Sequence, residues 1–307
     1  TDIFSSDRFL EYHRAGSGGT LPTLTRTRES LTAGDLYNSF YYSRLTTNGA
    51  GTTLGTNALA NIKQRIEFGT RLLCGDGKKV TLSFWARSSI ANKKLGVSLN
   101  QTYGTGGSPS ASETISGTNW TLTSTWTKYT YTFTTNTLVG KTFGTANNDY
   151  LEIYFFYMWA DQYKANVGAA SAETYVGSGN IDIAQVQLCA GDVALPFMPK
   201  SYEDELRACQ RYARPFPSVV VGQAWSTSGA YYSFSTGIQM RATPTFSAGQ
   251  YQTSTAASTA ANATLDVTSM VGNTIRFDTT AVAGSPLTAG HATMLTPPAG
   301  AMLEAEL

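Results

Sequence analysis

The chain has 307 residues and a formal net charge of +1, with 14% charged and 12% aromatic residues. A charge this close to zero argues against a nucleic-acid partner, because such partners need a basic surface that neutralises phosphates. No apolar run reaches the length of about 18 residues that a membrane-spanning helix needs, and the first residues lack the apolar core of a secretory signal, so we expect neither. Aromatic residues and Thr favour strands, which makes an all-β fold the leading interpretation.

Short strand-like runs dominate the first two thirds of the chain. Residues 61–79 (NIKQRIEFGTRLLCGDGKK) could form either a strand with a following turn or one helical turn. The clearest strand is 79–87 (KVTLSFWAR), where side chains alternate between two faces. Residues 150–159 (YLEIYFFYMW) are apolar or aromatic on both faces, which predicts a strand covered on both sides. Within 181–188 the apolar positions change face part-way along the run, which predicts a β-bulge or a bend.

Residues 201–214 contain the only clear helical pattern. Ser201 and Asp204 form a capping box, acidic residues fill the first turn, arginines follow, and Pro215 ends the pattern. At about 13 residues this helix is too short to be stable alone, so we expect it to dock on another element. Further strand-like runs follow it, and we expect the Thr-, Ser- and Ala-rich stretch at 253–263 to be a loop.

The order of these elements predicts three parts. Eight or so short strands separated by turn signals indicate a two-sheet jelly-roll β-sandwich over residues 1–200. A linker helix over 201–214 follows, and then a smaller, sandwich-like β domain over 215–307. The predicted fold class is therefore all-β: a jelly roll, a short helix and a second β domain.

Metal and disulfide chemistry find little support in the sequence. The cysteines, Cys74, Cys189 and Cys209, are odd in number and lack C-x-x-C spacing, so we expect them to be reduced and mostly buried. With His13 and His291 as the only histidines, a His–Cys zinc site has too few ligands.

Calcium is the remaining metal to consider, because it needs only oxygen ligands. Asp7, Asp182 and Asp192 could supply carboxylates, but no calcium-binding loop motif is present. We expect no cofactor, and a structural role for calcium if it binds at all.

Motifs for catalysis are missing from the chain. It has no nucleophile elbow, no phosphate-binding loop, no dinucleotide glycine pattern and no zinc-protease helix. A glycosidase needs two carboxylates about 5 to 9.5 Å apart. Glu152 lies in the aromatic run 150–159, and Asp149, Asp161 or Asp182 could be its partner. We interpret Glu152 as a polar residue on an outer or ligand-facing side, and we do not expect an enzyme.

Sugar binding is the chemistry that the aromatic content favours. Flat aromatic rings stack on the apolar faces of sugars, while neighbouring polar groups bind the hydroxyls. Tyr154 and Phe156 are two residues apart on one predicted strand, so they share a face at a spacing of about 7 Å. For each aromatic residue a position in the core is the ordinary alternative. The candidate glycan-binding residues are Tyr103, Trp120, Glu152, Tyr154, Phe156 and Trp159.

Several segments resemble a module of tailed-phage virion proteins that occurs in tail fibres and other host-facing parts. They are SFWAR at 83–87, YGTGGSPS at 103–110, STWTKYTYTF at 124–133, GTANNDYLEI at 144–153, IDIAQVQLCAGDVALPF at 181–197 and ELRACQRYA at 205–213. The ELxxCQRY pattern after a strand and a proline-bounded linker is the most specific part. The resemblance covers roughly residues 5–214, and MRATPTF at 240–246 resembles the β module that usually follows. Cys189, Met198 and Ala213 depart from the pattern at positions expected to affect packing or surface only.

The resemblance implies a carbohydrate-binding jelly roll in a non-enzymatic virion structural protein, a fibre, spike or head-decoration subunit. Such a protein lies on the particle surface and attaches to host surface polysaccharide. Other virion proteins are its implied partners, and a homotrimer its implied state. The resemblance does not define the binding residues. An architectural capsid-decoration or tail protein that binds no sugar is the alternative, and a glycan depolymerase is a weaker third.

Overall fold

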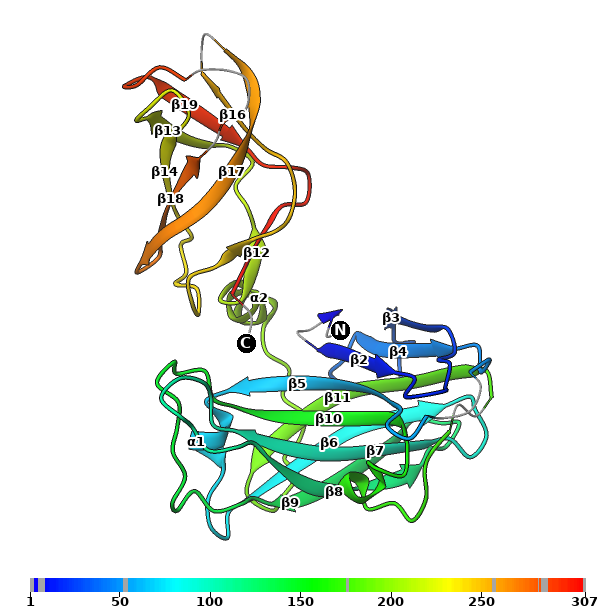
Figure 1. Cartoon of the computed structure of the whole chain (residues 1–307). Helices are drawn as coiled ribbons and strands as arrows, with labels where there is room; N and C mark the ends of the chain where they lie inside the picture. The colour runs from blue at the N-terminus through cyan, green and yellow to red at the C-terminus, as the bar shows by residue number, and fades with distance from the viewer. Residues whose placement is uncertain are drawn as a thin grey trace. The chain divides into compact units, whose positions relative to one another are not determined.

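A computed structural model describes residues 3–4, 9–51, 55–174, 177–255, 258–280, 282 and 287–305. Strands dominate both of its units, Thr1–Pro199 and Lys200–Leu307 (Figure 1). Among the described residues, the helical segments are α1 (Gly69–Leu73), the 3-10 helix η2 (Lys164–Val167) and α2 (Tyr202–Gln210). None of the helices in the described part of the chain has the length and apolarity needed to cross a membrane.

The first unit is a sandwich of two antiparallel sheets, as the jelly-roll prediction requires. One sheet has six strands in the order β1-β2-β5-β10-β7-β8, and the other has five in the order β3-β4-β11-β6-β9. The six are β1 (Ile3–Phe4), β2 (Leu10–Arg14), β5 (Leu59–Glu67), β7 (Lys94–Thr102), β8 (Glu113–Thr121) and β10 (Tyr150–Trp159). The five are β3 (Leu24–Ser30), β4 (Tyr41–Thr47), β6 (Lys79–Ser88), β9 (Thr127–Thr134) and β11 (Gly179–Ala190). The segment 61–79 therefore begins as strand, within β5, and continues into the short helix α1.

The core between the two sheets fixes the orientation of each strand. Alternate residues of β10, Leu151, Ile153 and Phe155, are buried in this core. Because successive side chains on a strand point to opposite faces, Tyr154 and Phe156 lie on the face of the six-stranded sheet that looks away from the second sheet. The same alternation on β5 and β7 assigns polar side chains to this outer face.

The bulge predicted in residues 181–188 is confirmed. The register between β11 and β6 shifts between Ala184 and Gln187, and Gln185 has a φ of 50°. The Gln187 side chain then holds the chain that leaves β11. Its amide nitrogen donates hydrogen bonds to the carbonyls of Leu195 and Pro196 at 3.0 and 3.1 Å, and its amide oxygen accepts one from the Met198 backbone at 3.2 Å.

The predicted helix is present but shorter than expected. The Ser201 hydroxyl accepts a hydrogen bond from the Asp204 backbone at 3.1 Å, which confirms the predicted cap. α2 ends at Gln210, because Ala213–Pro215 form the strand β12. None of its residues is buried, and Leu206 is 42% exposed, so the buried apolar face expected of a docked helix is not found.

The second unit closes its strands into a barrel, not the sandwich-like arrangement predicted for 215–307. The barrel order is β13-β14-β18-β17-β16-β19, and β13 pairs with both β14 and β19, so no edge remains open. Beside it is a small sheet of β12, β20 and β15. The barrel strands are β13 (Val220–Ala224), β14 (Ala230–Ser235), β16 (Tyr251–Thr255), β17 (Ser258–Val271), β18 (Thr274–Thr280) and β19 (Ala292–Thr296). The small sheet adds β15 (Thr245–Phe246) and β20 (Met302–Glu304).

The Thr-rich stretch at 253–263, expected to be a loop, is paired strand along most of its length. Gln252 lies opposite Asn262, and Thr253 lies opposite Ala261. Thr is β-branched and fits a pleated surface, and backbone pairing needs no large side chain. The low-complexity composition therefore led to the prediction of a loop where β16 pairs with β17.

All three cysteines are free, as expected. Cys74 and Cys189 are buried, whereas Cys209 is partly exposed. Burial raises the pKa of the Cys74 thiol to about 12, which keeps it protonated and unreactive at neutral pH.

Phe84 tests whether the sandwich core carries the stability of the first unit. It is fully buried and contacts the rings of Trp120, Tyr129 and Phe155. We expect Phe84→Ala to lower the free energy of unfolding by about 3–5 kcal/mol, the usual cost of such a cavity. Denaturant unfolding followed by Trp fluorescence measures this, because four of the five Trp residues lie in the first unit.

The matched control for this variant is Val139→Ala, because Val139 is 83% exposed. It should stay within about 0.5 kcal/mol of the parent. A similar small effect of Phe84→Ala would contradict the assignment of Phe84 to the core.

Candidate functional site

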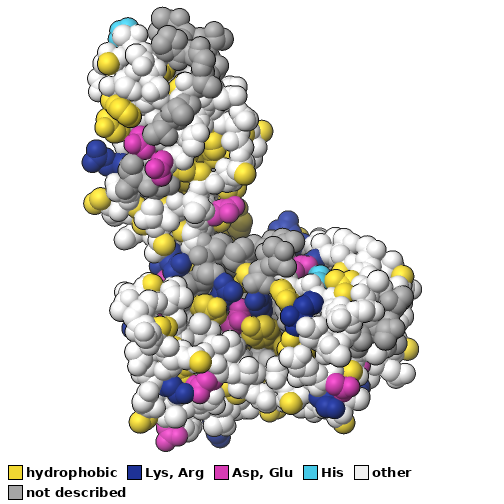
Figure 2. All heavy atoms as spheres, in the orientation of Figure 1, with side chains coloured by type: hydrophobic (Ala, Val, Ile, Leu, Met, Phe, Trp, Pro, Cys, Tyr) yellow, Lys and Arg dark blue, Asp and Glu magenta, His cyan; other side chains and the backbone are white. Residues whose placement is uncertain are grey.

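A groove of about 420 Å³ lies on the outer face of the six-stranded sheet. Strands β2, β5, β7 and β10, the start of β8 and the 3-10 helix η2 supply its lining. Figure 2 shows this face of the first unit, where hydrophobic side chains are gathered together with Lys and Arg. Segments that are far apart in the sequence therefore meet in one cavity, of the size that binds small ligands.

The floor of the groove is an aromatic pair on β10. Tyr154 and Phe156 stack with ring centroids 5.5 Å apart and an angle of 19° between the rings. Phe156 is 3% exposed and rests on the buried Trp159 and Val167, whereas Tyr154 is partly exposed. Tyr154 therefore offers ring surface to a ligand, and Phe156 supports it from below.

Glu152 holds Tyr154 in place. Its carboxylate is 2% exposed and accepts hydrogen bonds from Arg65, at 3.0 Å, and from the Tyr154 hydroxyl; the Lys63 ammonium lies 3.6 Å away. Burial raises the pKa of Tyr154, and the neighbouring Glu152 charge raises it further, so the hydroxyl stays protonated and remains the donor. These contacts give Glu152 a positioning role: its carboxylate fixes the Tyr154 hydroxyl.

Asn61 brings an unused acceptor into the groove. It lies on β5 directly opposite Phe156 and is 2% exposed. No described residue donates a hydrogen bond to its side-chain oxygen. A buried amide oxygen without a donor is costly and uncommon in folded proteins. In a groove, such an oxygen is an acceptor available to a ligand hydroxyl.

The loop after β10 forms one wall of the groove. Its residue Glu173 exchanges two backbone hydrogen bonds with Trp159, at 2.9 and 3.2 Å. The Glu173 carboxylate also pairs with the Lys93 ammonium at 3.0 Å, and both side chains are buried. Tyr163, at the start of η2, accepts a hydrogen bond from Arg14 of β2. The wall is therefore fixed to the sheet at both ends.

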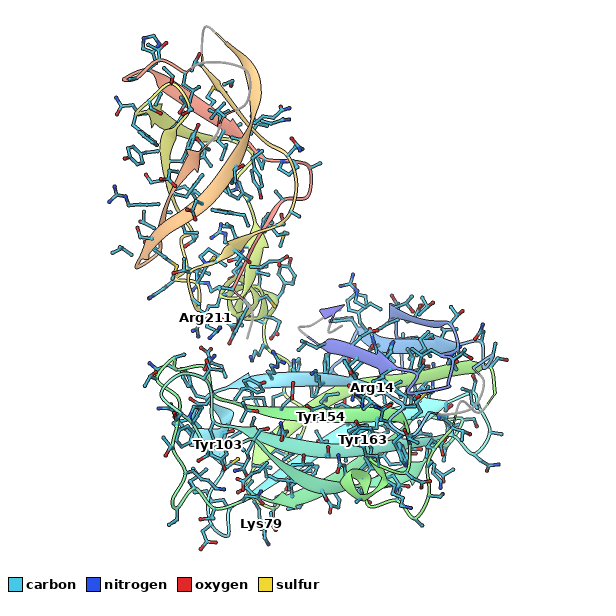
Figure 3. The ribbon with its side chains drawn as sticks, viewed as in Figure 1. Arg14, Lys79, Tyr103, Tyr154, Tyr163 and Arg211 are labelled. Carbon is cyan, nitrogen blue, oxygen red and sulfur yellow. The ribbon has the colours of Figure 1, made fainter. Side chains whose placement is uncertain are left out.

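Three of the six candidate residues lie at the groove: Tyr154 and Phe156 line it, and Glu152 supports it. Figure 3 shows Tyr154 on the six-stranded sheet. Trp159 is fully buried, and its indole donates to the Ser171 carbonyl at 3.0 Å. The loop after β10 covers Trp159, which is therefore a core residue and presents no surface to a ligand.

Trp120 and Tyr103 are also away from the groove. Trp120 lies opposite Leu95, a core residue, so it points inward and contacts Phe84. Tyr103 is 1% exposed, and its hydroxyl donates to Glu113. Neither side chain presents a surface that a ligand in the groove could reach.

The sequence interpretation missed the residues that other strands bring to the groove. The sequence interpretation assigned no strand to residues 10–14, where β2 carries Tyr12 and Arg14. The sequence did contain a signal for these residues, because residues two apart on a strand share a face. Tyr12 and Arg14 have this spacing, and so do the polar residues Asn61 and Lys63, which flank the apolar Ile62.

Two of the calcium candidates, Asp182 and Asp192, are each paired with basic side chains. Both carboxylate oxygens of Asp182 accept hydrogen bonds from Arg44 and Arg87, at 2.7 to 2.9 Å, and Asp192 pairs with Lys79 at 3.3 Å. Asp7 lies outside the described residues. In the part of the chain that the structure describes, no group of three or more His, Cys, Asp or Glu side chains is arranged to hold a metal ion.

The chain matches no protein-family model and none of the curated proteins. Among solved structures it is similar to the enzymatically active domain of bacteriophage CBA120 tailspike protein 4, at 16% identity and a TM-score of 0.33, over 61% of this chain and 20% of that chain. The chain thus spans about a fifth of that structure's length.

Two carbohydrate-binding structures are also similar to the chain. The N-terminal cellulose-binding domain of Cellulomonas fimi β-1,4-glucanase C is 16% identical with a TM-score of 0.31, over 58% of this chain and 96% of that one. The family 11 carbohydrate-binding module of Clostridium thermocellum is 12% identical with a TM-score of 0.32, over 61% and 92%.

Glu152→Gln tests the positioning role of the buried carboxylate. The variant removes the charge that Lys63 and Arg65 share and keeps the size of the side chain. We expect the free energy of unfolding to fall by about 1–3 kcal/mol, measured by denaturant unfolding. Asp161→Asn is the control, because the Asp161 side chain is 74% exposed and its ion pair with Lys164 is worth little. Equal effects of the two variants would contradict the role of Glu152.

Glu113 predicts an acid-dependent loss of stability. Its hydrogen bond from Lys141, and a second one from Tyr103, lower the pKa of the carboxyl below its ordinary 4.5. A carboxyl with a lowered folded-state pKa stabilises the fold above that ordinary pKa, and this contribution is lost as pH falls through the folded-state pKa. Glu113→Gln should therefore be less stable than the parent at neutral pH, and the difference should shrink below the ordinary pKa. A difference that stays constant with pH would contradict the prediction.

Proposed function

We propose that this chain is a virion-surface protein that binds host-surface glycan in the groove on its six-stranded sheet. The observation that carries the proposal is the pairing of a partly exposed ring, Tyr154, with a buried acceptor, Asn61, that no described residue satisfies. Sugars present apolar ring faces beside hydroxyl groups, and these two features match the two kinds of surface.

The side of the groove formed by β7 and β8 offers further polar groups to a sugar. Ser98 and Asn100 of β7 and Thr114 of β8 line it with hydroxyl and amide groups. A sugar ring stacked on Tyr154 would direct its hydroxyls toward these groups on one side and toward Asn61 on the other. The lining is supplied by strands, which keeps these groups at fixed spacing.

The absence of catalysis is part of the proposal. Hydrolysis of a glycosidic bond needs two carboxylates flanking it. No Asp or Glu is among the described residues that line the groove, and the nearby Glu152 is engaged by Arg65, Lys63 and Tyr154. Release of reducing ends from a bound polysaccharide would overturn this part.

Three parts of the proposal rest on the sequence resemblance of residues 5–214. They are the location in a virion, the contact with other virion proteins, and the homotrimeric state. Immunogold labelling of intact particles with antibody against the chain tests the location. Labelling of the particle surface would support it, and labelling only of disrupted particles would contradict it. Sedimentation of the purified chain tests the trimer.

Asn61→Ala separates ligand binding from stability. Removing an acceptor to which no described residue donates should leave the free energy of unfolding nearly unchanged. The variant should bind glycan about 5- to 10-fold more weakly, the usual effect of losing one hydrogen bond to a ligand. Binding is measured by calorimetry with a polysaccharide that the parent binds on a glycan array. Tyr231→Ala, at a 55% exposed tyrosine in the barrel, is the control. Undiminished binding by Asn61→Ala would move the site away from this groove.

A further inference from the structure

We infer that the glycan bound in this groove is acidic, and that Arg14 pairs with a carboxylate on one of its sugars. The inference rests on the proposed glycan binding and specifies the class of glycan. It follows from the charges that line the groove, from the partners of Arg14, and from the position of Arg14 relative to the aromatic floor.

The lining of the groove carries positive charge. Arg14 and Lys63 are the charged residues among the described residues that line it. Lys63 lies 3.6 Å from the Glu152 carboxylate, which offsets its charge. The chain as a whole has a net charge of only +1, so this concentration is local.

The partners of Arg14 among the described residues are neutral. Its Nε donates to the Asn57 carbonyl at 2.8 Å, and its Nη2 donates to the Tyr163 hydroxyl. Its guanidinium carbon lies 5.9 Å from the centre of the Tyr12 ring and 5.8 Å from that of Tyr163. No described carboxylate forms an ion pair with it. The charge is thus held in a fixed place, partly shielded from water, without a counter-ion from the described residues.

A sugar carboxylate fits this arrangement better than a neutral sugar does. The guanidinium has five N–H donors in a planar fork, and two of its nitrogens contact Asn57 and Tyr163. A neutral sugar in the groove would displace water from Arg14 and supply no charge in return, which costs binding free energy. A carboxylate replaces the water with a charge-assisted hydrogen bond.

The position of Arg14 is compatible with simultaneous stacking. Arg14, Tyr154 and Tyr163 line the same groove and lie on one face of the sheet in Figure 3. A uronic acid has an apolar ring face and a carboxylate on the same ring. One such sugar, or two neighbouring sugars of a chain, would contact Tyr154 with the ring and Arg14 with the carboxylate.

The experiment compares acidic polysaccharides with the same polymers after each carboxylate group has been reduced to a neutral primary alcohol. Full-length protein is titrated with alginate, polygalacturonate, hyaluronan and polysialic acid, each in both forms, and with neutral glucans and xylans. We expect binding to at least one acidic polymer and a loss of about tenfold or more on reduction. Equal binding of both forms, or binding of neutral polymers only, would overturn the acidic class and leave the proposed function standing. Binding of no polymer, neutral or acidic, would count against both.

Two variants assign the preference to Arg14. Arg14→Gln should lower affinity for the acidic polymer about tenfold and bring it close to that for the reduced form. Lys128→Gln removes the same charge at an exposed position on β9 of the other sheet and should leave the preference intact. A preference unchanged in Arg14→Gln, or lost equally in Lys128→Gln, would overturn the role of Arg14. Denaturant unfolding of Arg14→Gln shows whether the loop at Tyr163 is still held.

Discussion

The shape of the groove depends on a buried ion pair that joins Lys93, next to β7, to Glu173 in the loop after β10. Burial lowers the pKa of Lys93, and the Glu173 carboxylate opposes this effect. Buried ion pairs contribute little net stability, but losing one partner is costly because the other charge stays buried. The pair therefore acts mainly on conformation: it holds the loop against the sheet, covers Trp159, and places Tyr163 beside Arg14.

The features that the sequence predicted correctly depend on local patterns. The alternation in 79–87, the continuous apolar run at 150–159, the phase change in 181–188 and the cap at Ser201 each follow from neighbouring residues. For the same reason Tyr154 and Phe156 were assigned to one face. These arguments need only the period of a strand or a helix, which the chain itself displays.

The features that could not be predicted depend on contacts between distant segments. Trp159 is an aromatic residue of the kind that stacks on sugars. It is a core residue here because the loop after β10 folds back over it. The lining from β2 and β5 reaches the groove through strand order, which alternation does not reveal. Closure of the second unit into a barrel depends in the same way on β13 pairing with β19, far away in the sequence.

The bulge in β11 has a mechanical consequence. Through Gln187 it ties the outgoing chain, at Leu195, Pro196 and Met198, to the end of β11 that pairs with β6. The pairs between β11 and β4 involve Gly179–Ile183, on the other side of the bulge. A pull on the outgoing chain therefore first loads the three hydrogen bonds of one side chain, and only then the ladder between β11 and β6.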